Sequence, residues 1–195
     1  MSTMAVTLQT GTEKLIKALD HAVRSGKGDV QAITDGVKNA LTDLISSRRI
    51  DLPQELRQPR AEGYARRQVY QSPDLGYEVI AMIWGPGQGT PLHDHAGIWC
   101  VEGVYSGEIR VCQYELMERR DDLYRFRPCE SVQAHLGESG SLIPPFEYHT
   151  IHNNLQDEAS ITIHVYGAPM EHCSIFEPTE QDGWYSKKSK TLSYD

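Results

Sequence analysis

TPLHDHAGIWCVEGVYSGEIRV, residues 90–111, is the stretch that decides the fold of this chain. It predicts two short strands that flank a His-x-His pair at His93 and His95. Residues i and i+2 of a strand project to the same face, so the two imidazoles are expected to point together into the interior of a barrel. A third imidazole beside them would complete a metal site.

The rest of the chain from about Tyr64 onward has the same character. Runs such as YEVIAMIW and ASITIHVYG are rich in β-branched and aromatic residues, and glycine-containing turns separate them. Many short strands without intervening helices are typical of a small antiparallel barrel or jelly roll. The predicted fold class is therefore mainly β, with the barrel over residues 61–180.

Residues 1–60 are predicted to form a helical segment that packs on the barrel. Apolar residues recur at helical spacing over residues 12–48, with a break at Gly26-Lys27-Gly28, and nothing in this part suggests catalysis. Residues 181–195 are polar and are expected to form a C-terminal tail that wraps the surface or stays free of it.

The composition argues against several classes of protein. Apolar residues make up 39% and charged residues 24%, as in globular proteins, and no apolar run is long enough for a membrane span. The first residues lack the pattern of a signal peptide, so a cytoplasmic location is expected. The net charge of −8 argues against binding to nucleic acid. The four cysteines form no Cys-x-x-Cys pair and are expected to be reduced.

A second histidine cluster follows some fifty residues after the first. In LIPPFEYHTIHNN, residues 142–154, both His149 and His152 are candidates for a third metal ligand. A lone buried histidine more often satisfies local hydrogen bonds, but two on one face and a third downstream favour a metal. Three neutral imidazoles suit iron, zinc, copper or nickel, and they leave the metal's full charge available to an anionic ligand such as a thiolate.

These two stretches resemble the two sequence motifs of the cupin barrel. The first motif usually has a glutamate shortly after its His-x-His, but Glu102 follows His95 too late for that position. The second motif aligns on His149 and Asn153, which favours His149 over His152. Because the usual glutamate is missing, we expect a ligand set of three histidines without a carboxylate.

Residues 64–176 resemble the thiol dioxygenase family, which includes cysteine dioxygenase and the bacterial mercaptopropionate and mercaptosuccinate dioxygenases. The blocks WGPGQGTPLHDH and YHTIHN match the family's metal-binding segments. The resemblance implies a cupin barrel, a mononuclear Fe(II) held by His93, His95 and His149, and oxidation of a small thiol by O2 to a sulfinic acid.

The strand within ASITIHVYGAPMEHC is the most specific part of this resemblance. The family has Ser-x-His-x-Tyr here, a hydrogen-bonded relay that ends in a tyrosine hydroxyl beside the iron. This chain has Thr162, His164 and Tyr166, which share one face of a strand, and the threonine keeps the hydroxyl. The family's Ser-Pro-Pro after the tyrosine is replaced by Gly167-Ala168-Pro169, which affects the expected substrate more than the expected reaction.

Cys100 lies seven residues after the first ligand, where animal cysteine dioxygenases have a cysteine that forms a thioether with the relay tyrosine. The resemblance therefore implies a Cys100–Tyr166 crosslink as a hypothesis. The alternative is a small buried thiol that packs as an apolar side chain.

Carboxylate recognition in the family uses an arginine on the strand before the WG motif in cysteine dioxygenases, and a glutamine in the mercaptopropionate enzymes. This chain has Arg66, Arg67 and Gln68 in succession, and only one of the two arginines can face inward. Counting back from Trp84 favours Arg67, whereas aligning Tyr64 favours Arg66. The planar guanidinium fits a carboxylate at two points, and the tyrosine could add a hydrogen bond.

The predicted function is thus that of a non-haem Fe(II) thiol dioxygenase acting on a small carboxylate-bearing thiol. The arginine and Cys100 favour cysteine, with 3-mercaptopropionate and mercaptosuccinate as alternative substrates. Two rival hypotheses are a cupin dioxygenase or isomerase of a non-thiol substrate that uses the same three histidines, and a metal-free or zinc-bearing cupin that serves as a metal-binding sensor or binding module. The oligomeric state is left open.

Overall fold

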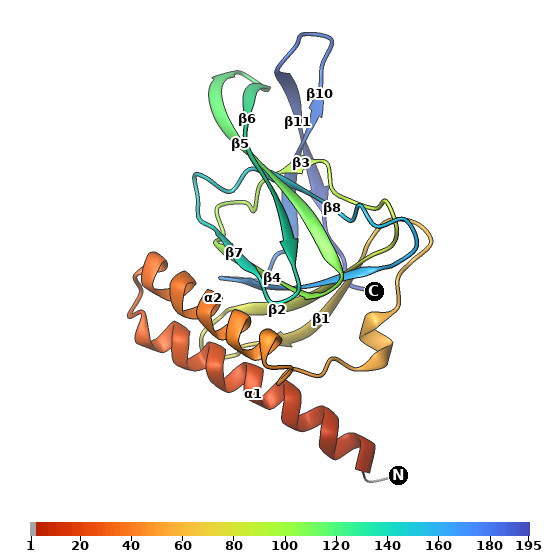
Figure 1. Cartoon of the computed structure of the whole chain (residues 1–195). Helices are drawn as coiled ribbons and strands as arrows, with labels where there is room; N and C mark the ends of the chain where they lie inside the picture. Colours follow the sequence, from red (N-terminus) through yellow and green to blue (C-terminus); the bar gives the residue numbers. More distant parts are fainter. Residues whose placement is uncertain (1–2) are drawn as a thin grey trace.

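A computed structural model describes residues 3–195, with side chains from residue 11 onward. Two α-helices and a short 3-10 helix precede eleven strands (Figure 1). The helices are α1 (Thr3–Ser25), α2 (Val30–Ser46) and η1 (Gln54–Arg57). The strands are β1 (Ala65–Gln71), β2 (Glu78–Trp84), β3 (Leu92–His93), β4 (Cys100–Ser106), β5 (Glu108–Arg120), β6 (Leu123–His135), β7 (Ser139–Leu142), β8 (His149–His152), β9 (Ser160–Tyr166), β10 (His172–Pro178) and β11 (Trp184–Thr191).

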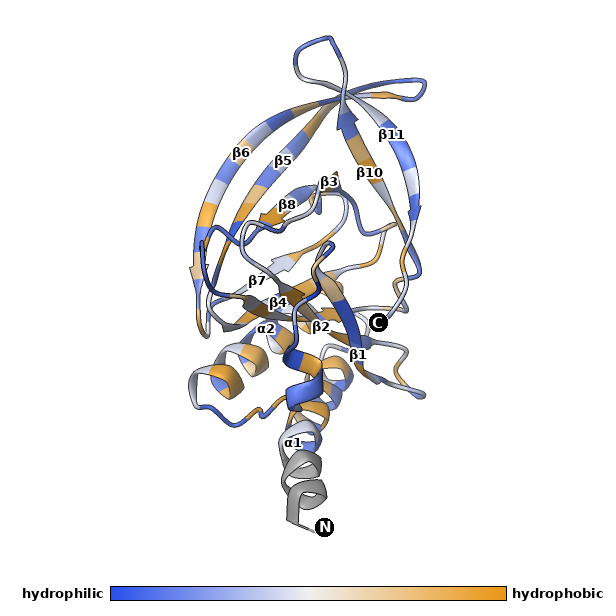
Figure 2. Ribbon diagram, turned by 90° about the vertical axis from the view of Figure 1, so that its right-hand side faces the viewer, coloured by the Kyte–Doolittle hydropathy of each residue, from blue (hydrophilic) through white to orange (hydrophobic). Residues whose placement is uncertain are grey.

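The strands form two antiparallel sheets. One has the order β1-β2-β9-β4-β7, and the other, β10-β11-β6-β5-β8-β3, closes on itself because β3 pairs with both β8 and β10. Figure 1 shows the long hairpins β5-β6 and β10-β11 rising at the end of the molecule opposite the helices. Hydrophobic and hydrophilic residues alternate along β5 and β6 (Figure 2). The predicted mainly β, cupin-type barrel with N-terminal helices is confirmed.

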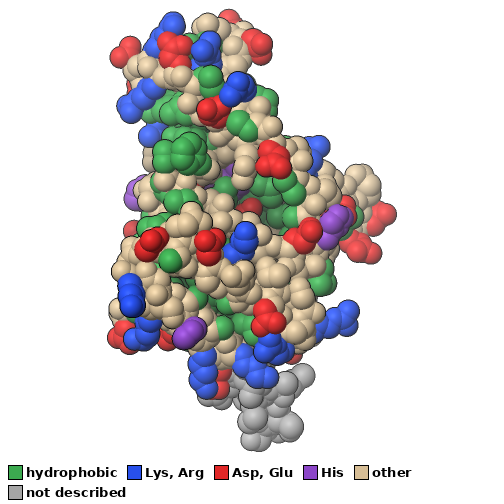
Figure 3. Space-filling view, turned by 60° about the vertical axis from the view of Figure 1, so that its left-hand side comes forward, with side chains coloured by type: hydrophobic (Ala, Val, Ile, Leu, Met, Phe, Trp, Pro, Cys, Tyr) green, Lys and Arg blue, Asp and Glu red, His purple; other side chains and the backbone are tan. Residues whose placement is uncertain are grey.

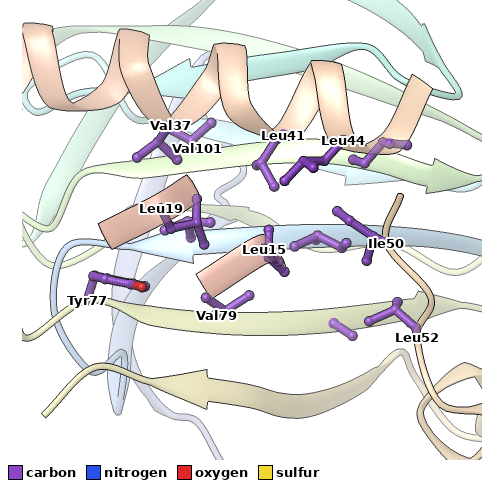
Figure 4. Close-up of a cluster of buried hydrophobic side chains, with 14 of the residues drawn as sticks. Leu15, Leu19, Val37, Leu41, Leu44, Ile50, Leu52, Tyr77, Val79 and Val101 are labelled. Atoms are coloured by element: carbon purple, nitrogen blue, oxygen red, sulfur yellow. The ribbon is translucent and has the colours of Figure 1, made fainter. Parts of the chain in front are cut away.

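The two helices cover the outer face of the five-stranded sheet. Strands β2 and β9 are buried along their whole length, because one face turns into the barrel and the other packs against helices. Apolar side chains of α1, α2 and the sheet form one cluster there (Figure 4). Its members include Leu15, Leu19, Val37, Leu41, Val79, Val101 and Ile163. The helices thus allow the central strands to be apolar on their outer face, while the inner face is free to carry polar chemistry.

Alternation along β4 divides its residues between these two environments. Val101 belongs to the helix-side cluster, and Cys100 and Val104 belong to the cluster inside the barrel. At Gly103 the helix lies so close that a Cβ would come 3.0 Å from Cδ1 of Ile45. A larger residue there would displace the side chains of Ser139 and Ile45.

Residues 181–195 differ from the expected polar tail. Strand β11 lies within this segment and pairs with β10 from Tyr185 to Thr191 and with the start of β6. Its sequence WYSKKSKT has few apolar residues, because most of its side chains face solvent and only Trp184 is buried. Backbone pairing rather than apolar burial defines the strand, so the barrel extends past residue 180.

Over residues 3–195, no helix has the length and apolar character needed to cross a membrane. Figure 3 shows acidic and basic side chains interspersed over the face in view.

Candidate metal and substrate site

Three histidine side chains meet inside the barrel. His93 ends β3 and pairs in register with His149 of β8, and His95 follows two residues later. One ligand atom from each ring lies within 4.8 Å of the others. The ring centroids are 4.3 Å apart for His93 and His149, and 5.0 Å apart for His95 and His149. The structure therefore brings together the three residues that the sequence singled out as metal ligands.

A turn, not an extended strand, aims His95 at the cluster. Strand β3 ends at His93, so the expectation that both rings project from one strand is wrong. The carboxylate of Asp94 accepts hydrogen bonds from the backbone N–H of Ala96 at 3.1 Å and of Ser174 at 2.8 Å. Ala96 has a φ of 53°, which turns the chain sharply after His95. These contacts fix the turn that presents the ring.

The donor set fits a metal ion. Nδ1 of His149 lies 2.7 Å from the carbonyl oxygen of Glu147, and Nδ1 of His93 lies 3.1 Å from the carbonyl oxygen of Pro91. When each Nδ1 donates its hydrogen to that carbonyl, Nε2 of each ring keeps its lone pair for a metal ion. Among the described residues, Nε2 of His149 is buried without a hydrogen-bond partner. Burial lowers the pKa of His93 to about 4 and lowers the pKa values of His95 and His149 well below the usual value. All three rings are therefore neutral at pH 7, as metal binding requires.

The rival ligand His152 lies outside this cluster. Its ring packs against Gly89, where a Cβ would overlap it, and it is only half-buried. Asn153 is fully buried and structural: its amide donates to the carbonyl oxygens of Trp84 and Glu158, both at 2.9 Å.

A chain of hydrogen bonds runs along the inner face of β9 towards the histidines. Trp84 donates from Nε1 to Oγ1 of Thr162 at 2.9 Å, and Oγ1 lies 2.7 Å from Nε2 of His164. Nδ1 of His164 lies 3.3 Å from the Tyr166 hydroxyl, whose ring meets His95 edge-on at 5.5 Å between centroids. Because an indole N–H can only donate, Thr162 accepts from it, and its own hydrogen is free to be donated to Nε2. When Thr162 donates to Nε2, the ring hydrogen of His164 is on Nδ1.

Burial keeps the titratable members of this hydrogen-bonded relay uncharged. It lowers the pKa of His164 to about 3 and raises the pKa of Tyr166 well above its ordinary value. The loop that follows departs from the family's Ser-Pro-Pro for a local reason: the Trp99 indole lies against Gly167, where any Cβ would overlap it.

Cys100 is directly opposite Tyr166 in the pairing of β4 with β9. Its Sγ lies 3.9 Å from Nδ1 of His164, and the side chain is fully buried. Burial raises the pKa of the thiol well above its usual value, so the sulfur is present as a neutral thiol. The structure thus places Cys100 beside the relay.

Arg66, and not Arg67, reaches the site. Arg66 is buried and its Nη2 donates to the carbonyl oxygen of Met170 at 2.7 Å. Its Nη1 is buried without a hydrogen-bond partner among the described residues. Arg67 is on the outer face, where Nη1 donates to the carbonyl oxygen of Glu55 at 2.7 Å.

A cavity of about 20 Å³ joins these groups. The Tyr64 ring packs on Trp84 at 4.7 Å between centroids, and burial raises the pKa of its hydroxyl. The cavity is lined by Tyr64, Arg66, Met82, Trp84, Thr90, His93, His95, His149, Ile151, His164, Tyr166, Met170, Cys173 and Leu192.

Sequence reasoning missed the buried carboxylate that holds Arg66. Glu78 is fully buried, lies 3.7 Å from Nη2 of Arg66, and accepts from the Met170 N–H at 3.1 Å. Its other oxygen accepts from Gln68 at 2.8 Å and from the Tyr194 hydroxyl. The sequence feature that could have identified Glu78 is its position as an acidic residue at the start of an otherwise apolar strand, EVIAMIW.

A cupin-type barrel with a buried three-histidine cluster is the class that this fold and site define. The chain belongs to the cysteine dioxygenase type I family, whose sequence model matches residues 14–179. Human cysteine dioxygenase type 1 is 19% identical over 124 residues, which cover 60% of this chain and 56% of the human protein. The Danio rerio protein of the same name is 19% identical over 177 residues, covering 85% of this chain and 78% of that protein. The chain thus spans little more than half the length of its human relative.

Two solved structures show partial similarity to this chain. TT1209 from Thermus thermophilus is 22% identical with a TM-score of 0.47, covering 62% of this chain and 96% of that one. A Klebsiella pneumoniae protein with a double-stranded β-helix domain is 21% identical with a TM-score of 0.47, covering 64% of this chain and 88% of that one.

We expect His149→Ala to weaken the binding of a divalent first-row metal such as Fe(II) by more than about 100-fold, because it removes a ligand. Loss of a group that only orients a ligand already lowers metal affinity about 10- to 100-fold. His152→Ala, the matched control, should leave the affinity unchanged. Anaerobic titration of the metal-free protein measures both. Equal losses in the two variants would contradict the assignment of the third ligand.

Proposed function

We propose that this protein is a non-haem Fe(II) thiol dioxygenase that oxidises a small carboxylate-bearing thiol with O2 to the sulfinic acid, with cysteine as the first candidate. The observation that carries the proposal is the unpartnered Nη1 of buried Arg66, which lines the same cavity as the three histidines. Membership of the cysteine dioxygenase type I family supports the same activity.

The histidine cluster is suited to a substrate that brings its own negative charge. His93, His95 and His149 would hold the metal as neutral ligands, without a carboxylate to offset its charge. When bound, Fe(II) supplies a Lewis acid that favours the thiolate form of the substrate and the redox chemistry that O2 needs. The protein supplies the placement of the thiol.

Arg66 would fix the other end of the substrate. Its guanidinium cannot swing freely, because the Met170 carbonyl and Glu78 hold Nη2. Nη1 is left to bind a carboxylate, and Tyr64 lines the same cavity and can add a hydrogen bond. Holding the carboxylate at a fixed distance from the histidines places the sulfur at the metal position.

Tyr166 would orient the substrate from the third side. Its hydroxyl is held by His164, His164 is held by Thr162, and Thr162 accepts a hydrogen bond from Trp84. The phenol stays protonated because burial raises its pKa, so it acts as a hydrogen-bond donor towards the reacting sulfur and oxygen atoms.

A second candidate substrate is a thiol without an amino group, such as 3-mercaptopropionate. Of the described residues that line the cavity, only Arg66 is charged at neutral pH, and none offers a carboxylate to an ammonium group. An amine would therefore gain no ionic partner from these residues.

The first test is oxygen consumption by anaerobically iron-loaded protein with cysteine, 3-mercaptopropionate and mercaptosuccinate in parallel. Consumption matched by sulfinate formation with one thiol is the expected result. Bound iron with no consumption for any of them would favour a cupin enzyme of a non-thiol substrate, and absence of iron binding would favour a metal-independent binding module.

Arg66→Gln should raise the KM for carboxylate-bearing thiols roughly 10- to 100-fold, the value of one or two lost charged hydrogen bonds. Arg66→Lys should rescue this only in part, because it keeps the charge but loses the planar fork. Arg67→Gln is the control and should match the unmodified protein. Cysteamine, which has no carboxylate, should be oxidised equally by all variants; a parallel loss for cysteamine would show that Arg66 has another role.

The position of Cys100 opposite Tyr166 supports the thioether hypothesis. The bond would join Sγ to a ring carbon, with the two displaced hydrogen atoms taken up by O2. Protein turned over with iron and O2 should lose the mass of two hydrogen atoms and one titratable thiol, and Cys100→Ser should lose neither. Four free thiols and an unchanged mass after turnover would contradict the crosslink.

A further inference from the structure

A buried carboxyl group lies behind the relay, and the proposed mechanism does not use it. Glu102 is on the inner face of β4, directly opposite His164 of β9. It is 6% exposed, and its Oε2 lies 3.5 Å from Nδ1 of His164. Among the described residues this oxygen has no hydrogen-bond partner, although it lies close to Nδ1. A small rotation of either side chain would complete the bond.

Glu102 and Tyr166 therefore compete for one nitrogen. Nε2 of His164 is taken by Thr162, which leaves Nδ1 and its single hydrogen for other partners. The Tyr166 hydroxyl is 3.3 Å from Nδ1 and Oε2 of Glu102 is 3.5 Å from it. One N–H makes one full hydrogen bond, so strengthening the bond to Glu102 weakens the bond to Tyr166.

The charge of Glu102 decides this competition. Burial raises the pKa of its carboxyl to about 8, so it is neutral at pH 7. The titratable groups that face it are Cys100 on its own strand, His164 and Tyr166 on β9, and Glu138 across a neighbouring cavity. A carboxylate is a stronger acceptor than a neutral acid or a phenol, so ionised Glu102 takes the N–H.

A second cavity gives Glu102 its own route to solvent. This cavity, of about 250 Å³, lies between β4, β5, β6 and β7, and Glu102 forms part of its wall. It reaches the surface at Val132, Glu138 and Gly140, which are exposed. The hydroxyl of Ser139 on its wall is also buried without a partner among the described residues. The volume is sufficient for several water molecules beside polar groups.

We propose that Glu102 is a positioning residue that acts through His164: in its neutral form it leaves the Nδ1 hydrogen to Tyr166, and in its ionised form it withdraws that hydrogen. The second cavity carries its proton to and from solvent without passing the metal cluster. The effect on catalysis rests on the proposed thiol oxidation, whereas the hydrogen-bond competition does not.

Infrared difference spectroscopy on the metal-free protein tests the competition directly. Between acid and alkaline pH, the carbonyl stretch of a buried carboxylic acid should disappear with a midpoint near pH 8. Glu102→Gln should lack this band, and Glu138→Gln, altered on the surface end of the same cavity, should keep it. The ¹⁵N shift of His164 Nδ1 should move over the same range only where Glu102 is present. A carboxyl that is already ionised at neutral pH, or an Nδ1 shift that ignores it, would overturn the proposal.

The activity measurement follows the same variants with iron bound. If kcat follows the neutral fraction of Glu102, it should fall about tenfold from about pH 7 to about pH 9. Glu102→Gln and Glu102→Leu, which cannot ionise, should remove this fall, and Glu138→Gln should keep it. Equal falls in all proteins would overturn the catalytic role. If no variant oxidises any thiol, the proposed function fails, and the spectra of the metal-free protein still decide whether Glu102 controls His164.

Discussion

The pairing of a two-residue strand with two neighbours is the constraint on which the structure depends. Strand β3 pairs with β8 through His93 and His149, and with β10 through Leu92 and His93. The same contacts that close the second sheet therefore bring the first and third histidines together. The turn held by Asp94 adds His95 to them. The same strand pairings thus both close the barrel and assemble the candidate metal site.

Low polarity around this cluster sets the charges of the whole site. Burial lowers the pKa of each histidine and raises the pKa values of Cys100, Tyr166 and Glu102, so that each group is in its neutral form at pH 7. Arg66 carries a positive charge, and Glu78 lies beside it as an ionic partner, since a buried charge without a partner is costly. A site of this kind has one fixed cationic anchor and a neutral ligand set.

The sequence was informative wherever a local pattern corresponds to a contact. The alternation of Thr162, His164 and Tyr166 on one strand predicted their shared inner face, and the register with Asn153 selected His149. The choice between Arg66 and Arg67 depended on the pairing of two strands, which spacing alone does not reveal. Arg66 pairs with Met82, and both line the cavity.

Contacts between distant segments explain what the sequence could not show. The segment after β11 is polar, yet Leu192 lines the cavity and the Tyr194 ring lies 4.7 Å from the Arg66 guanidinium. The Tyr194 hydroxyl also donates to Glu78, the carboxylate that holds Arg66. The surroundings of Arg66, the proposed carboxylate anchor, are thus built from the first strand of the barrel, the second strand and the residues that follow the last. The helices pack on the outer face of the sheet, whereas Leu192 and Tyr194, from the end of the chain, lie on the cavity side near Arg66.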